Sequence, residues 1–175
     1  MKYNRPFARK QNGATTMEVL FFLIVAALVL YGVVQMGFKL FGKQTNNTEQ
    51  SNVAELIINT RALKSSQGYG ASGTNIVPQL IATDGIPNGL TVVSNVAYNA
   101  WNGVVSVASA GVAFTITYQS VPKDACVALA TKVAKNQAFS TRINSGTALT
   151  GEVTAAIATT SCSGTSNTVA WTVSS

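Results

Sequence analysis

Residues 19–38 read VLFFLIVAALVLYGVVQMGF, a run of twenty residues without a charged side chain. At about 1.5 Å per residue, a helix of this length is roughly 30 Å long, which matches the hydrocarbon thickness of a bilayer. Lys2, Arg5, Arg9 and Lys10 precede the run, and the first thirteen residues contain no acid. Because basic residues stay on the cytoplasmic side, the pattern predicts a membrane helix with a cytoplasmic N-terminus.

A cleaved signal peptide and a buried core helix are the two alternatives to a membrane anchor. A secretory signal peptide has an apolar core of about 7–15 residues and then a small-x-small cleavage site. This run is longer, and its exit at Gln35 to Lys39 has no such site. The length of the run also disfavours a core helix of a globular domain. We therefore expect an uncleaved anchor.

The composition excludes several classes of function. The 175 residues suit one domain with an accessory segment, and only 10% of them are charged, against about 25% in typical soluble domains. The chain has no histidine, which rules out histidine general bases, histidine metal ligands and a Ser-His-Asp triad. The acids beyond the anchor are scattered, at Glu49, Glu55, Asp84, Asp124 and Glu152. We expect no catalytic residues, no metal site and no cofactor, with a membrane-anchored enzyme as a remote alternative.

The net charge of +6 raises the question of nucleic acid binding, but four of these charges lie in the first thirteen residues. Lys123, Lys132, Lys135 and Arg142 form the only candidate basic stripe downstream. Such residues on a helix usually form a solvated face. We expect no nucleic acid partner, and a DNA-binding module stays a remote alternative.

One acidic residue, Glu18, stands at the start of the apolar run. An unpaired carboxylate carried into lipid costs on the order of 2–3 kcal/mol. Glu18 is therefore either solvated at the headgroup level, where the helix dipole favours an anion, or paired with a cation.

The residues around Glu18 read GATTME over positions 13–18, between the basic leader and the apolar run. This junction resembles the class III signal of type IV prepilins. The resemblance implies that a membrane-embedded prepilin peptidase cuts after Gly13 and methylates the new N-terminal residue, Ala14. Glu18 then occupies the fifth mature position.

In the chemistry that the resemblance implies, cleavage creates an α-amine at Ala14 that pairs with Glu18 of a neighbouring subunit. Such a pair sets the register between subunits, since a slip by one turn leaves two charges unpaired in an apolar core. Ala14 and Glu18 are four residues apart, so a pair within one helix is the alternative.

The segment after Gly42 predicts a continuation of the helix. Val53, Leu56, Ile57 and Leu63 fall on one helical face. We expect an amphipathic half that continues to about Lys64. The glycine-rich residues 67–73 then end the helix, and they lack the Gly-Lys-Ser/Thr of a phosphate-binding loop.

The remaining sequence predicts a sheet with a second helix. Residues 91–96 are rich in β-formers, and residues 104–107 and 112–118 predict a hairpin around 108–111. Pro122 opens a helix that runs to Val133. Residues 168–173 predict a last strand, and together these elements give an α+β domain.

Residues 112–118, VAFTITY, followed by 123–131, KDACVALAT, are similar to the type IVb pilins, the branch of the bundle-forming and conjugative thin-pilus pilins. The resemblance implies a long N-terminal helix packed on an antiparallel sheet, with a second helix and a disulfide-bounded C-terminal region. In an exported domain Cys126 and Cys162 are most simply one disulfide, and two buried free thiols are the alternative. We expect the polar region between the cysteines to be the exposed face.

These expectations combine into a domain plan: a cleaved leader at 1–13, a transmembrane and filament-core helix at 14–42, its amphipathic continuation at 43–66, and a globular head at 67–175. The expected function is that of the major pilin of a type IVb pilus, which serves adhesion, aggregation or conjugative cell contact. A minor pilin or a type II secretion pseudopilin is the alternative.

The expected partners are further copies of the chain, prepilin peptidase and the pilus assembly platform with its ATPase. A recipient or host cell surface is a further candidate. The precursor is expected in the inner membrane, and the mature chain in the extracellular fimbrium.

Overall fold

A computed structural model describes residues 16–135 and 137–174, apart from the side chains of 38 and 39. The chain divides into two compact units between Gly42 and Lys43. Helix α1, Thr16–Ala62, is the first element and the only described helix long and apolar enough to cross a membrane. It ends two residues before the predicted end at Lys64. The long N-terminal helix is therefore confirmed.

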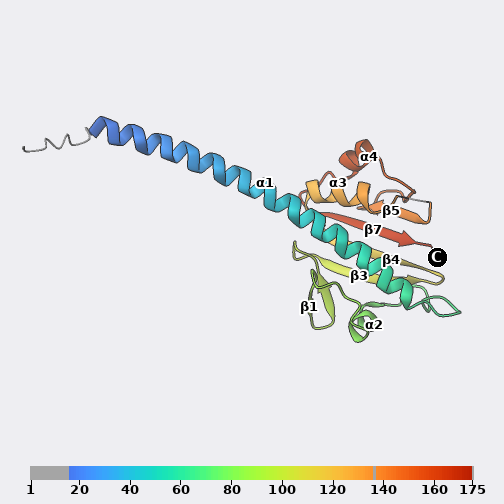
Figure 1. The fold of residues 1–175 in the computed structure, drawn as a ribbon. Helices are drawn as coiled ribbons and strands as arrows, with labels where there is room; N and C mark the ends of the chain where they lie inside the picture. Colours follow the sequence, from blue (N-terminus) through green and yellow to red (C-terminus); the bar gives the residue numbers. More distant parts are fainter. Residues whose placement is uncertain (1–15, 136, 175) are drawn as a thin grey trace, which may run out of the picture. The chain divides into compact units, whose positions relative to one another are not determined.

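The second unit contains one seven-stranded antiparallel sheet in the order β1-β2-β3-β4-β7-β5-β6 (Figure 1). The last strand along the chain is central, because β7 pairs with β4 on one side and β5 on the other. The strands are β1 Thr91–Val93, β2 Val96–Tyr98, β3 Val104–Ala110, β4 Ala113–Val121, β5 Phe139–Ile143, β6 Leu149–Thr150 and β7 Asn167–Val173.

The core lies between one face of the sheet and the part of α1 that follows Lys43. Phe114, Ile116 and Tyr118 alternate with less buried residues along β4, as a half-buried strand requires. They join Val53 and Leu56 of α1 in one apolar cluster. The other face is polar, as in the 2.9 Å hydrogen bond between the Thr115 and Thr172 hydroxyls of β4 and β7.

Three shorter helices complete the unit: α2 Val77–Ala82, α3 Lys123–Lys132 and α4 Ala155–Ser161. Helix α3 follows Pro122, as predicted. A disulfide joins Cys126 of α3 to Cys162, the residue after α4. The α+β class with a disulfide-bounded C-terminal region is confirmed.

Two predicted strand boundaries are wrong. Residues 91–96 are not one strand, because Ser94 and Asn95 have φ values of 49° and 64° and turn the chain between β1 and β2. Two positive φ values suit the tight turn that matches the twist of a hairpin. Strand β3 continues to Ala110, and its turn to β4 lies at Gly111 and Val112.

The expectation that the polar region between the cysteines is the exposed face holds for most of its polar side chains, such as Lys132, Arg142 and Glu152, but not for the whole region. This region supplies β5 and β6, and Phe139, Thr141 and Ile143 are buried. Strand β7 pairs with β4 along one edge and with β5 along the other. The side chains of β5 that face the core must therefore be covered, while the alternate ones stay accessible.

Candidate functional site

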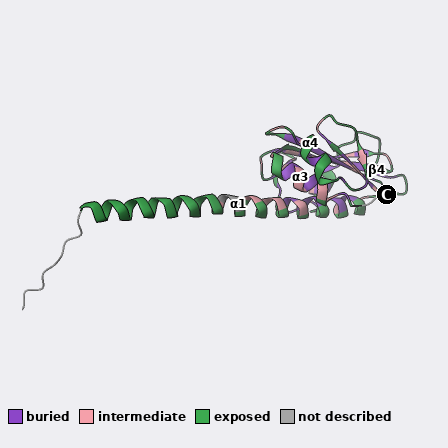
Figure 2. Cartoon of the chain, turned by 90° about the horizontal axis from the view of Figure 1, so that it is seen from above, coloured by how far each residue is buried: buried purple, intermediate pink, exposed green. Residues whose placement is uncertain are grey.

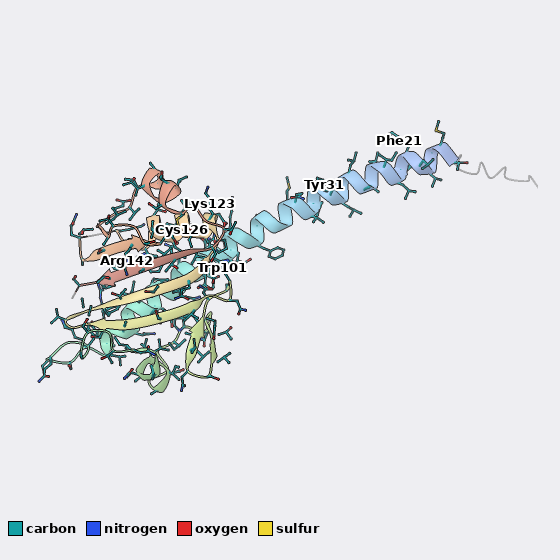
Figure 3. All side chains as sticks on the ribbon, turned by 180° about the vertical axis from the view of Figure 1, so that it is seen from behind. Phe21, Tyr31, Trp101, Lys123, Cys126 and Arg142 are labelled. Atoms are coloured by element: carbon teal, nitrogen blue, oxygen red, sulfur yellow. A yellow bond between two sulfur atoms is a disulfide. The ribbon has the colours of Figure 1, made fainter. Side chains whose placement is uncertain are left out.

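The part of α1 before Gly42 carries a continuous apolar surface that no described residue covers. Phe22, Leu28 and Tyr31 are 71%, 66% and 67% exposed. Figure 2 shows this part of the helix in the colour of exposed residues, and Figure 3 shows the side chains of Phe21 and Tyr31 pointing outward. An apolar surface of this extent marks a lipid or protein contact. A surface of this kind suits contact with a bilayer or with other chains.

Glu18 lies in the first turn of α1 and is exposed. Together with Val19, Phe22, Leu23 and Ala26 it lines a shallow apolar hollow of about 320 Å³. A single carboxylate at the margin of an apolar surface calls for a cationic partner once that surface is covered. Gly13 and Ala14 lie outside the described residues, so the cleavage site and the pair with Ala14 stay predictions.

The disulfide fixes the C-terminal part of the head. Cys126 and Cys162 are fully buried, with Cα atoms 5.9 Å apart and a sequence separation of 36. Helix α4 is capped by Thr154, whose hydroxyl accepts the Ile157 N–H at 3.4 Å. The bond therefore ties the end of a short, weakly favoured helix to the better packed α3.

A second carboxylate on α1, Glu49, is fully buried. Its Oε1 accepts the backbone N–H of Ala100 at 2.8 Å, and its Oε2 accepts an amide hydrogen of Asn52 at 3.2 Å. Ala100 belongs to the turn between β2 and β3. Glu49 therefore joins α1 to the sheet at the start of the second compact unit, Lys43–Ser175, which we call the head unit.

The turn that meets Glu49 is shaped by Asn99. The Oδ1 of Asn99 accepts the N–H groups of Trp101 and Gly103 at 3.0 and 2.9 Å, and its Nδ2 donates to the carbonyl of Gln119 at 2.8 Å. Asn99 thereby satisfies the neighbouring donors of the turn and leaves the Ala100 N–H for Glu49. Such a side-chain turn is a known role of asparagine.

Burial raises the pKa of the Glu49 carboxyl above its ordinary value, although the hydrogen bonds from Ala100 and Asn52 and the neighbouring Tyr118 lower it. Burial also raises the pKa of the Tyr118 hydroxyl well above its ordinary value, with a further contribution from the Glu49 charge. The two side chains interact without a well-formed hydrogen bond between them. The Glu49 side chain is thus held by a backbone donor at a position shielded from solvent.

The sequence analysis missed the role of Glu49 and treated it as one of several scattered acids. A signal was present, because Glu49, Val53, Leu56 and Thr60 recur at helical spacing on one face of α1. All four are fully buried. A carboxylate on an apolar stripe indicates a buried, hydrogen-bonded group.

The residues of the candidate basic stripe come from separate elements, with Lys135 beyond the end of α3. Lys123 and Lys132 stand at opposite ends of α3, about 13 Å apart at 1.5 Å per residue. Arg142 is exposed on β5 between the buried Thr141 and Ile143, so it lies on the opposite face of the sheet from the core.

Comparison with known proteins gives one match for the head unit. The family model described as PilS N terminal matches residues 43–174. The comparison with curated proteins gives no match. The matched range contains the head part of α1, the whole sheet and both cysteines. The chain therefore belongs to the PilS family, a structural-protein family of type IV pilins associated with conjugative thin pili.

Proposed function

We propose that this pilin is the major subunit of a type IVb pilus, which it forms by polymerising through the first half of α1. The observation that carries the proposal is the uncovered apolar surface of α1 in a chain whose head belongs to a pilin family. Lipid covers that surface before assembly and the same helices of other subunits cover it afterwards. One surface thus serves in the inner membrane and in the extracellular fimbrium.

Processing prepares the helix for this transfer. Prepilin peptidase cuts after Gly13, removes the four basic residues of the leader and methylates the amine of Ala14. The amine then pairs with Glu18 of a neighbouring subunit, which lies at the margin of the apolar surface. The apolar helices supply the attraction, and the ion pair rejects a wrong axial register, because both charges stay unpaired when the helices slip.

In this proposal, consecutive segments of the chain have different roles. Residues 1–13 are the leader, 14–42 form the filament core, 43–66 connect the core to the head, and 67–175 form the head. The assembly platform and its ATPase extract the subunit from the membrane. The pilus then serves adhesion, aggregation or conjugative contact with a recipient or host cell.

The register role of Glu18 is tested by Glu18→Gln, which keeps the size of the side chain and removes its charge. We expect the variant to insert into the membrane and to be cleaved, while the amount of pilin in sheared filaments falls at least about tenfold, because a buried amine then lacks its counter-charge. Mass spectrometry of membranes and immunoblots of the sheared fraction measure the two steps.

Glu55→Gln is the matched control, since Glu55 is an exposed glutamate in the head part of the same helix. It should assemble as the unchanged chain does. Filaments from Glu18→Gln in normal amount would contradict the register role.

A further inference from the structure

Charge is unequally divided between the two sides of the head. From Ser65 to Pro122 the sequence contains a single charged residue, Asp84, whereas residues 123–174 contain four basic and two acidic residues. The first segment builds α2 and β1 to β4, and the second builds α3, α4 and β5 to β7. Figure 1 shows α2 and β1 on one side of the head part of α1, and α3 with α4 on the other.

The side of α3 carries an apolar groove with a basic rim. The groove has a volume of about 220 Å³ and is lined by Ile57 and Ile58 of α1, Val133 and Phe139, with Lys132 at its margin. Ile58 is 65% exposed.

A second cation, Arg61, lies beside Phe139, one of the residues that line the groove. The guanidinium of Arg61 lies 5.9 Å from the centre of the Phe139 ring, which is within cation–π range. The groove therefore offers apolar contact and two positive charges.

The side of α2 carries a patch of mixed polar and apolar residues around a single acid. Ile81, Ile86 and Val92 line a shallow hollow of about 270 Å³ together with Asp84; Val92 is 41% exposed, whereas Ile81 and Ile86 are half-buried and pack against the core. Asp84 has a φ of 53°, and the next residue, Gly85, donates its N–H to the carbonyl of Leu80 at 2.7 Å. This turn fixes the backbone conformation at Asp84, so the position from which its exposed side chain extends is also fixed.

The groove and the patch carry charges of opposite sign and do not meet within one chain. Strand β1 and strand β5 are five places apart in the sheet, which at about 4.8 Å per strand separates them by roughly 24 Å. Two different patches that fit each other on opposite sides of a subunit make a head-to-tail contact, and such contacts generate open helical assemblies when the rotation does not close.

We propose that the Asp84 patch of one subunit docks into the Lys132 groove of the next subunit in the filament. Val92, with the accessible parts of Ile81 and Ile86, covers Ile58, and the Asp84 carboxylate meets Lys132 and Arg61. The inference rests on the filament proposed above, but it places a second contact in the head, away from Ala14 and Glu18. The charge pair gives the contact its direction, because two grooves or two patches repel each other.

Charge reversal tests the contact in cells that assemble filaments from the full chain. Asp84→Lys and Lys132→Glu should each lower pilin in sheared filaments by roughly tenfold, and the double variant Asp84→Lys/Lys132→Glu should recover most of the loss, as expected for a close charge pair. Asp84→Asn removes the charge with a residue that tolerates positive φ, so its loss of filaments is not caused by backbone strain. Glu152→Lys and Arg142→Glu are matched controls outside the two surfaces.

A cysteine pair tests the same contact by position. A chain carrying Ile58→Cys and Ile86→Cys should give a ladder of disulfide-linked multimers when filaments are oxidised and run without reductant. Ile157→Cys with Ile86→Cys is the control, since Ile157 is exposed on α4 outside the groove. Either single variant should stay monomeric.

The outcomes separate this contact from the filament as a whole. Recovery in the double variant together with the ladder supports the contact. Normal filaments from the single reversals, no recovery in the double variant, or no ladder would overturn it while the role of Glu18 stands. Absence of filaments from the unchanged chain would overturn the proposed function, and the contact with it.

Discussion

Glu18 and Glu49 are carboxylates on the same helix in opposite surroundings. Glu18 is exposed beside an apolar surface, whereas Glu49 is buried and accepts a backbone N–H of the sheet. In our proposal the first pairs with another chain, whereas the second has its partners within its own. A helix that must join a filament core to a head needs both kinds of contact.

The stability of the head depends on Glu49. Glu49→Ala leaves the Ala100 N–H and the Asn52 amide without their acceptor, and we expect the free energy of unfolding to fall by about 2–3 kcal/mol. Glu49→Gln keeps an acceptor for Ala100 and should lose less than about 1 kcal/mol. Thermal unfolding of the full chain in detergent, followed through its tryptophans, measures both changes.

The same carboxyl gives the unchanged protein a pH dependence that Glu49→Gln should lack. Because the folded pKa of Glu49 is raised, the folded state keeps the proton at pH values where the unfolded chain releases it. The stabilisation is complete below the unfolded pKa and is lost as the pH rises through the folded pKa. A constant difference between the unchanged chain and Glu49→Gln across this range would contradict the account.

At the scale of elements, α1 is a regular helix through two glycines, Gly32 and Gly37. Each glycine lowers helix propensity by about 1 kcal/mol relative to alanine. We therefore expect α1 to loosen at these positions when it leaves lipid for the filament. A filament map should show the loosened segment, and Gly32→Ala/Gly37→Ala should close it, since a Cβ at either position meets no atom within 4 Å. An unbroken helix through both glycines in the unchanged filament would contradict the prediction.

The disulfide connects α3, which is well packed against the core, to the end of α4, which buries only Ala158. Replacing Cys126 and Cys162 by alanine opens a loop of 36 residues, and the chain-entropy model gives a loss of roughly 3–4 kcal/mol. We expect α4 to lose its protection from amide hydrogen exchange before α3 does, because α3 packs on β7 through buried residues such as Leu129. Equal loss of protection in the two helices would show that the disulfide stabilises the head as one unit.

The elements that the sequence predicts well are those with a strong local signal. Neighbouring residues alone indicate the length and periodicity of α1, the start of α3 at Pro122 and the alternation of β4. Helix α2 is too short for a periodic signal, and α4 reads AAIATTS, in which threonine and isoleucine favour strands.

Strand β5 escaped prediction for a different reason. Its middle residue, Thr141, is polar but buried opposite Trp171 of β7, so the alternation is weak. Its place in the sheet depends on backbone pairing with β7, a strand more than twenty residues later in the chain. In the candidate site, Glu18 was predicted because it is an acid at the start of the apolar run, and Glu49 was missed because its acceptor role depends on the turn at Ala100.

At the scale of the whole molecule, the charged residues of the N-terminal segment and those of the head have different proposed roles. Four of the six net positive charges lie in the proposed leader, where they orient the helix in the membrane. The head keeps a nearly uncharged side with Asp84 and a basic side with Lys132. In the proposed filament, loss of the leader leaves a nearly neutral subunit, in which we propose that Glu18, Asp84 and Lys132 act between copies.

Mass spectrometry of sheared extracellular filaments tests the central claim most directly. The account predicts that the filament subunit begins at Ala14, carries a methyl group on that amine, and contains the Cys126–Cys162 disulfide. Recovery of the chain only as the uncleaved precursor in membranes, with none in the sheared fraction, would contradict it.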